Sequence, residues 1–188
     1  VFRFETAPAN AKAGQDYRIS DFELASRLSF FLWGSIPDEQ LLTLAQQHKL
    51  SDVATLDREV KRMLADPRAE ALSTRFAAQW LRLQDLDKVR PDAFWFPDFD
   101  QQLADAMVRE TQLFFYDILR QNKSVLDLFS ADYTYLNEPL ARHYGIPNVS
   151  GEEFRRVSYP DDTRRGLLGH GSILVQTSLA NRTSPVLR

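Results

Sequence analysis

The chain has 188 residues, of which 44% are hydrophobic and 26% are charged, which is typical of a globular protein with a substantial core. Its net charge of −3 argues weakly against nucleic acid or an anionic membrane as the main partner, and no stretch approaches the roughly 20 apolar residues of a membrane span. Because cysteine is absent, disulfides, thiolate catalysis, iron–sulfur clusters and covalent CxxCH haem attachment are excluded within this chain.

The chain opens with a connector followed by a first helix. Residues 1–18 lack a periodic apolar pattern and contain the run TAPANAKAGQ, which is rich in small residues. Ser20 and Glu23 have the spacing of a capping box, which predicts a helix that starts there and runs to Trp33. The residues expected on its buried face are Phe22, Ala25, Leu28, Phe31 and Leu32.

Three more helices are expected before the middle of the chain. Pro37 should open the second, which ends near His48. A third should run over residues 53–64, and Asp66 should cap a fourth that begins at Pro67. From Ser20 to the middle of the chain, helices are therefore expected to predominate.

An aromatic loop separates these helices from the longest one. Residues 87–100, DKVRPDAFWFPDFD, combine prolines with aromatic rings, which is typical of a loop packed down by its own rings. Asp98 or Asp100 should then cap a long helix whose apolar face runs from Leu103 to Leu119.

Glu110 interrupts that apolar face. It lies three residues after Met107 and four before Phe114, so a regular helix points its carboxylate among apolar side chains. Such a carboxyl either has a raised pKa and belongs to a functional site, or is paired with an arginine such as Arg75 or Arg142 that ties two helices together. Glu110 is therefore the first candidate for a catalytic residue.

Two further helix starts lie downstream of the long helix. Ser124 and Asp127 have the spacing of a second capping box, for one short turn. Asn137 should cap a helix that ends at Tyr144, because Gly145 supplies the left-handed residue that such ends prefer.

After Ile146 the chain is rich in loops. A short strand is possible at residues 154–158, and the run LLGHGSILVQTS is either a helix interrupted by glycine or a buried extended segment. Thr183 or Ser184, followed by proline, is expected to start another helix.

Two histidines are candidates for binding or catalysis. His143 lies near the end of the run ADYTYLNEPLARHYG and could be a general base, a metal ligand or an axial haem ligand, although the dipole at a helix end also stabilises such a histidine. His170 lies between two glycines, which would let a backbone or a ligand approach closely, and it could join His143 if the tail folds back. Without a His-x-x-x-His or Glu-x-x-His spacing, a self-contained metal site is not expected.

Arginines make the C-terminal region basic. They could hold haem propionates, an acidic glycan or an acidic neighbouring domain, with Arg182 as a cofactor-binding candidate, or they could form a solvated face with nearby acids. The arginines concerned are Arg155, Arg156, Arg164, Arg165, Arg182 and Arg188.

Several segments together resemble one known family. They are ELASRLSFFLWGSIPDEQLL, VKRMLADPRAEAL, FAAQWLRL, FDQQLADAMVRETQLFFYDIL, SVLDLFSADYTYLNEPLARHYGI, FRRVS and RRGLLGHGSILVQTSLANRTSPVLR. Over residues 21–157 the chain is similar to the planctomycete surface domain of the fourth type, a helical domain of unknown function. Residues 2–5 resemble the end of the domain that usually precedes it, and residues 164–188 resemble the start of the cytochrome-associated domain that usually follows. The resemblance implies export to the periplasm or cell surface and haem c in neighbouring modules, but no catalytic residues.

The sequence thus predicts an all-α fold, an irregular bundle of about six or seven helices with a loop-rich C-terminal segment. Residues 1–18 are expected to be a connector, residues 19–158 the helical domain and residues 159–188 the start of a following domain. Rings from residues 94–99 and 129–144 should close one side.

Three functions remain open. The first is a non-catalytic structural and docking module that positions neighbouring domains of a large exported, cytochrome c-containing protein, with no cofactor bound covalently within the chain. The second is part of an oxidoreductase acting on an extracellular polymer, which requires Glu110, His143 and the arginines to face one cavity. The third is carbohydrate binding by exposed rings at Trp95, Phe96 and Tyr159.

Overall fold

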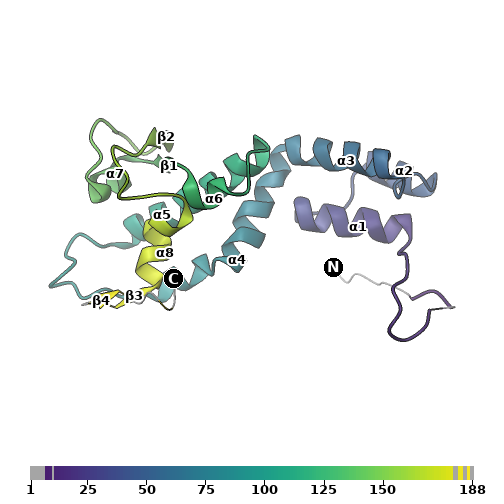
Figure 1. Cartoon of the computed structure of the whole chain (residues 1–188), viewed down its shortest axis with the longest axis horizontal. Helices are drawn as coiled ribbons and strands as arrows, with labels where there is room; N and C mark the ends of the chain where they lie inside the picture. Colours follow the sequence, from purple (N-terminus) through teal and green to yellow (C-terminus); the bar gives the residue numbers. More distant parts are fainter. Residues whose placement is uncertain (1–6, 10, 180–181, 184–185, 187–188) are drawn as a thin grey trace. The chain divides into compact units, whose positions relative to one another are not determined.

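The computed structural model describes residues 7–9, 11–179, 182–183 and 186, and its packing divides the chain into two compact units, Val1–Leu72 and Ser73–Arg188 (Figure 1). Both units are largely helical. Two short antiparallel sheets of two strands each are also present among the described residues. The all-α prediction is therefore correct for most of the chain and wrong for these strands.

The first unit consists of helices packed around a small core. Its elements are α1 (Asp21–Leu32), α2 (Glu39–Gln46), α3 (Val53–Ala65) and the short 3-10 turn η1 (Pro67–Ala69). Ser20 and Glu23 form the predicted capping box of α1. The second helix begins two residues later than predicted, because Asp38, rather than Pro37, takes the capping position and accepts the Leu41 N–H at 3.0 Å.

The buried face of α1 differs from the prediction. Ala25 and Leu32 are buried as expected, together with Ser29, but Phe22 and Phe31 are 52% and 55% exposed. Ala25 and Ser29 are small, so their side of α1 can pack closely in a unit where α1 contacts α2 and α3, and the larger rings are left on the outside.

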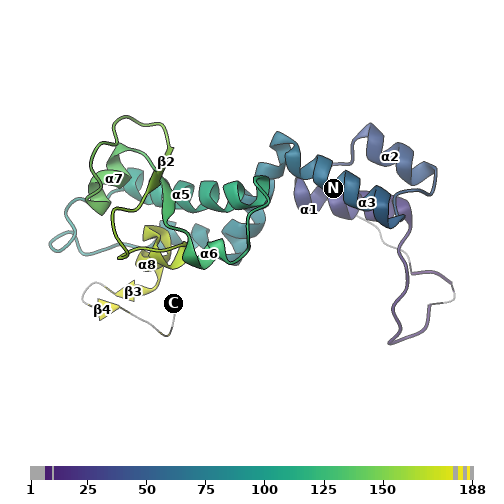
Figure 2. The same cartoon turned by 45° about the horizontal axis from the view of Figure 1, so that its top comes forward.

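The second unit is built around the long helix α5. In chain order its elements are η2 (Leu72–Ala77, a π-helical turn), α4 (Ala78–Trp80), η3 (Leu83–Lys88), α5 (Gln101–Arg120), α6 (Asp127–Ser130), β1 (Tyr133–Leu136), α7 (Glu138–Tyr144), β2 (Arg155–Ser158), η4 (Leu167–Gly169), α8 (Gly171–Gln176), β3 (Ser178–Leu179) and β4 (Arg182–Thr183). The element α8 lies beside α5 in both views of Figures 1 and 2 and packs against it. The chain beyond residue 158 thus contributes to the same folded unit as α5.

The strand expected at residues 154–158 is confirmed as β2. It pairs with β1 in an antiparallel register that sets Tyr133 opposite Ser158 and Leu136 opposite Arg155. The strand β1 was not predicted. Its four residues have the β-branched and aromatic composition of a strand, but the pairing depends on a partner far along the chain.

The helix ends of this unit follow the prediction with one exception. The carboxylate of Asp100 caps α5, Asn137 caps α7, and Gly145 ends α7 with φ of 69°. The predicted capping box at Ser124 is wrong, because α6 begins at Asp127 and the Ser124 hydroxyl instead accepts the Leu126 N–H at 3.2 Å.

Two other expectations about this unit are also corrected. Most of the loop rings do not pack down: Phe94 and Trp95 are largely exposed and contact each other edge to face at 5.3 Å, whereas Phe99 is partly buried against the core. Thr183 does not start a helix but lies in β4, while Ser184, like Arg188, falls outside the described residues.

Candidate functional site

A buried polar cluster surrounds Glu110 in the second unit. The helix α5 places Glu110 on its apolar face, as predicted, and the side chain has no exposed surface. Its Oε2 atom accepts the Tyr144 hydroxyl at 2.5 Å, and its Oε1 atom accepts the Thr134 hydroxyl at 2.6 Å. The carboxyl group therefore joins α5 to α7 and to β1.

The pleat of β1 explains how Thr134 reaches Glu110. Successive side chains of a strand point to opposite faces. Thr134 points toward Glu110, whereas Tyr133 points to the other side, where its hydroxyl donates to Asp117 at 2.9 Å and accepts from Lys123 at 3.0 Å. One short strand thus serves two separate polar clusters.

The start of α8 is attached to the same cluster. The Gly171 N–H donates to the Tyr144 hydroxyl oxygen at 2.6 Å. A Cβ atom at position 171 would lie 2.9 Å from that oxygen and 3.0 Å from Met107, so the close approach requires glycine. The Arg164 guanidinium stacks 4.0 Å from the centre of the Tyr144 ring and donates to the Gly169 carbonyl at 2.6 Å.

His170 lies next to this attachment and is fully buried. Its Nδ1 atom is 2.9 Å from the Thr111 hydroxyl, which is itself 2.7 Å from the Ser172 hydroxyl. The ring meets Phe114 edge to face at 4.8 Å, and Nε2 has no hydrogen-bond partner among the described residues. The buried Tyr159 hydroxyl is likewise without a partner there.

Burial sets the protonation of these groups. It raises the pKa of Glu110 to about 7, although the hydrogen bonds from Thr134 and Tyr144 favour the carboxylate and oppose this change. Burial lowers the pKa of His170 to about 3, with Arg164 acting in the same direction, so the imidazole is neutral at physiological pH. Burial and the Glu110 charge raise the pKa of Tyr144, which stays a neutral phenol.

The structure brings some of the predicted site residues together and separates others. Glu110 and His170 are both buried near the α8 attachment, but His143 is exposed on α7 and its pKa is lowered by partial desolvation and by Arg164. One alternative from the sequence paired Glu110 with Arg142. In the structure Arg142 instead pairs with Glu138 at 2.8 Å.

Arg182 is exposed in β4, and it is not among the residues described as hydrogen-bonded to the Glu110 carboxyl. Of the C-terminal arginines, Arg164 joins the cluster, while Arg165 pairs with Asp162 and Arg156 stacks on Tyr133 at 4.0 Å. Within the described ranges, no group of three His, Cys, Asp or Glu side chains is arranged to hold a metal ion. None of the helices described there is long and apolar enough to cross a membrane.

An apolar groove of about 510 Å³ lies elsewhere in the second unit. Residues of α4, η3 and α6 line it together with residues of η4 and α8, which are here called the η4 and α8 wall. Three large apolar side chains on it are about half exposed, namely Trp80 (53%), Phe129 (56%) and Leu168 (45%). The remaining lining residues are Leu81, Arg82, Asp85, Val89, Leu167, Ile173, Gln176 and Thr177.

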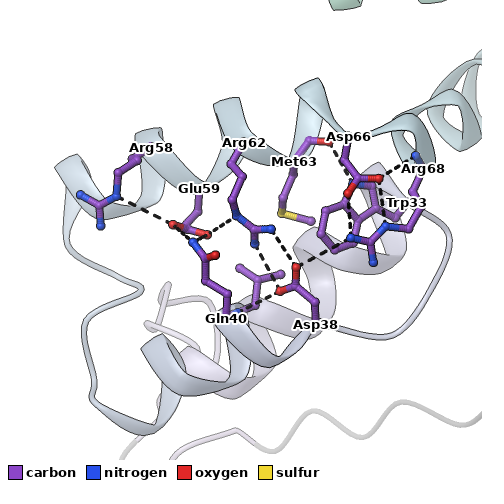
Figure 3. Close-up of polar contacts among 10 residues, drawn as sticks. Trp33, Asp38, Gln40, Arg58, Glu59, Arg62, Met63, Asp66 and Arg68 are labelled. Atoms are coloured by element: carbon purple, nitrogen blue, oxygen red, sulfur yellow. Dashed lines mark hydrogen bonds and ion pairs between the residues drawn. The ribbon is translucent and has the colours of Figure 1, made fainter.

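The first unit has a polar network of its own, drawn in Figure 3. Glu59 is buried and accepts the Gln40 amide at 2.9 and 3.0 Å and the Arg62 Nε–H at 2.8 Å. Arg62 also donates to both oxygens of Asp38, and Arg68 stacks 3.6 Å from the centre of the Trp33 ring. Because these side chains pair with one another, the network joins α2 to α3. The stack of Arg68 on Trp33 also joins η1 to the C-terminal end of α1.

Sequence reasoning missed several of the residues described above. Thr111 carried a detectable signal, since it follows Met107 by four residues and precedes Phe114 by three and is thus a second polar residue on the apolar face of α5. Thr134 and the groove residues Trp80 and Phe129 carried none, because their roles depend on contacts between distant segments.

The fold is mostly helical, and the buried side chains around Glu110 are hydrogen-bonded to one another. The sequence matches a family described as PSD4, a protein of unknown function (DUF1592), over residues 19–146. The chain belongs to this family. No curated protein and no solved structure matches the chain.

Proposed function

We propose that this chain is a structural and docking module of a larger exported polypeptide, in which it positions neighbouring domains that include cytochrome c modules. The observation that carries this proposal is the groove beside Trp80. Large exposed apolar side chains around a concave surface are typical of binding sites for another protein surface. Export and haem-containing neighbouring domains are proposed from two resemblances. Residues 21–157 resemble the planctomycete surface domain of the fourth type, and residues 164–188 resemble the start of the cytochrome-associated domain.

The buried cluster supports a structural role in preference to catalysis. A catalytic group must reach a substrate, but Glu110 and His170 have no exposed surface and do not line the groove. Their side chains are hydrogen-bonded instead to side-chain hydroxyls of neighbouring elements. We therefore assign these two residues to the packing of α5 against α7 and α8.

The docking proposal is tested by hydroxyl-radical footprinting of the natural polypeptide and of this chain alone. Trp80 and Phe129 should be oxidised at least several times more slowly in the natural polypeptide, because a docked domain covers them. The exposed Trp95 is the internal reference. Equal oxidation of Trp80 in the two samples would rule out docking at the groove.

Carbohydrate binding is a second candidate, favoured by the exposure of the loop rings. Trp95 is 67% exposed and Phe96 is 45% exposed, as stacking on a sugar ring requires, whereas the Tyr159 hydroxyl is buried. Titration with soluble cello- and xylo-oligosaccharides should quench Trp fluorescence in the wild type but not in Trp95→Ala. The absence of any fluorescence change would eliminate this candidate for those polymers.

A further inference from the structure

Residues 159–177, here called the closing segment, form one wall of the groove and cover the Glu110 cluster. The segment is attached to the family domain at its first residue and again within it: the Tyr159 N–H donates to the Asp132 carbonyl at 2.8 Å, and the Gly171 N–H to the Tyr144 hydroxyl at 2.6 Å. Its residues Leu168 and Ile173 face the groove. Movement of this segment would therefore change both the groove and the exposure of Glu110.

Glu110 is an unusual group to lie beneath such a segment. Its two oxygens accept hydrogen bonds from neutral hydroxyls, and the nearby Arg164 guanidinium is stacked on Tyr144 and bonded to the Gly169 carbonyl. Burial of a carboxylate that lacks a directly bonded cation is costly, whereas the neutral acid costs much less to bury when one of the two hydroxyls turns to accept its proton. The free energy of closure should therefore depend on whether Glu110 carries a proton.

We propose that Glu110 is a protonation switch for the closing segment: the segment is held on α5 when Glu110 is protonated and opens more readily when Glu110 is ionised. This inference rests on the proposed docking function in one respect, because opening removes the η4 and α8 wall from the groove. A docked domain would then be held at acidic pH and released as the pH rises to neutral.

The other titratable groups that face Glu110 do not change charge between pH 5 and pH 8. Tyr144 from α7 and Tyr159 from the end of β2 both have raised pKa values and stay neutral, and the pKa of His170, before α8, is lowered to about 3. Arg164 contributes a constant positive charge. His143 is exposed on α7, and its pKa is lowered, so it is the residue to test separately.

The direction of the effect follows from linkage. The pKa of Glu110 is raised from 4.5 to about 7 in the closed state, so between these values the closed state binds more protons than the open state. Opening therefore becomes more favourable as pH rises through this window and levels off above pH 7. The largest change in the opening equilibrium is on the order of 100-fold.

Hydrogen exchange of backbone amides in residues 167–177 tests the switch directly. Rates measured from pH 5 to pH 8 and corrected for the intrinsic chemistry should give an opening equilibrium that rises on the order of 100-fold in the wild type. Glu110→Gln, which cannot ionise, should remove this rise. His143→Ala should retain it. A wild-type opening equilibrium that is independent of pH, or an equal rise in Glu110→Gln, would overturn the proposal.

A second measurement covers the case in which Glu110→Gln does not fold. Carbon-13 NMR of the Glu110 carboxyl in the wild type should show a midpoint near pH 7, and a midpoint near its ordinary value of 4.5 would refute the switch. Footprinting of Trp80 separates this inference from the docking function. If the exchange rates respond to pH while Trp80 is never protected, docking fails and the switch stands.

Discussion

His170 is a single polar side chain that the sequence marks as a candidate for binding and that the structure buries completely. Its position between two glycines indicated a close approach by a backbone or ligand, and the structure places the backbone N–H of Gly171 against Tyr144. The imidazole itself is buried against Phe114, with only Nδ1 hydrogen-bonded among the described residues. Its environment is that of a core residue.

Substitution of His170 distinguishes packing from chemistry. His170→Phe should change the free energy of unfolding by less than about 1 kcal/mol, because it keeps a ring against Phe114 and removes the unpartnered Nε2, while Thr111 keeps its contact with Ser172. His170→Ala should cost about 3 kcal/mol through the cavity it leaves. Urea denaturation followed by circular dichroism measures both values. A large loss in the phenylalanine variant would mean that the imidazole hydrogen bond matters more than the packing.

Glu59 is the corresponding buried acid of the first unit, and its removal should be costly. Glu59→Ala leaves the Gln40 amide and the Arg62 Nε–H without their acceptor, so a loss of about 2 kcal/mol is expected even though Arg62 keeps Asp38 (Figure 3). Lys61→Ala, on the same helix, breaks only the exposed pair with Asp57 and should leave stability nearly unchanged. Thermal unfolding of the two variants side by side provides the comparison, and similar losses would contradict this account.

At the scale of elements, what could be predicted depended on how local each interaction is. The caps at Ser20, Asn137 and Gly145 were predicted correctly, because each one involves residues within a few positions along the chain. The partners of Glu110 were not predicted, since Thr134 and Tyr144 lie 24 and 34 residues away. Periodicity identifies which residue faces the core, but the residue it meets there is decided by tertiary packing.

The turn at Gly166 holds the closing segment against α6, and only glycine fits there. Its φ of 47° and ψ of −158° are unfavourable for other residues, and a Cβ atom would lie 2.4 Å from the Leu128 carbonyl oxygen and 2.7 Å from the Phe129 backbone. Gly166→Ala should therefore destabilise the second unit by at least about 3 kcal/mol.

Gly151→Ala is the matched control for Gly166→Ala. Gly151 also has a positive φ, of 86°, but a Cβ atom there would meet nothing within 4 Å, so the cost should be about 1 kcal/mol. Chemical denaturation of both variants gives the two values. Equal losses would show that backbone conformation, and not the contact with α6, sets the requirement at position 166.

For the whole molecule, the extent of the family match and the extent of the folded unit differ. The match ends at residue 146, whereas β2, η4 and α8 pack on the same unit as α5. The boundary expected from the sequence lies between residues 158 and 159, within the loop-rich part of the chain, and composition cannot reveal contacts across it that join single residues such as Gly171 and Tyr144. Composition reports on local structure and not on which segments complete a core.

Truncation tests whether residues 147–179 are required for the second unit to fold. A chain ending at Ile146 loses the β2 partner of β1 and uncovers Glu110, Met107 and Phe114, so its α5 amides should exchange at least 100 times faster than in the full chain. A chain ending at Leu179 keeps the contacts described above around Glu110 and should retain the protection of α5. Hydrogen exchange with mass spectrometry compares the three chains. If α5 is equally protected in the shortest chain, the family domain folds without its C-terminal cover, and the closing segment is an accessory layer over a core that is already complete.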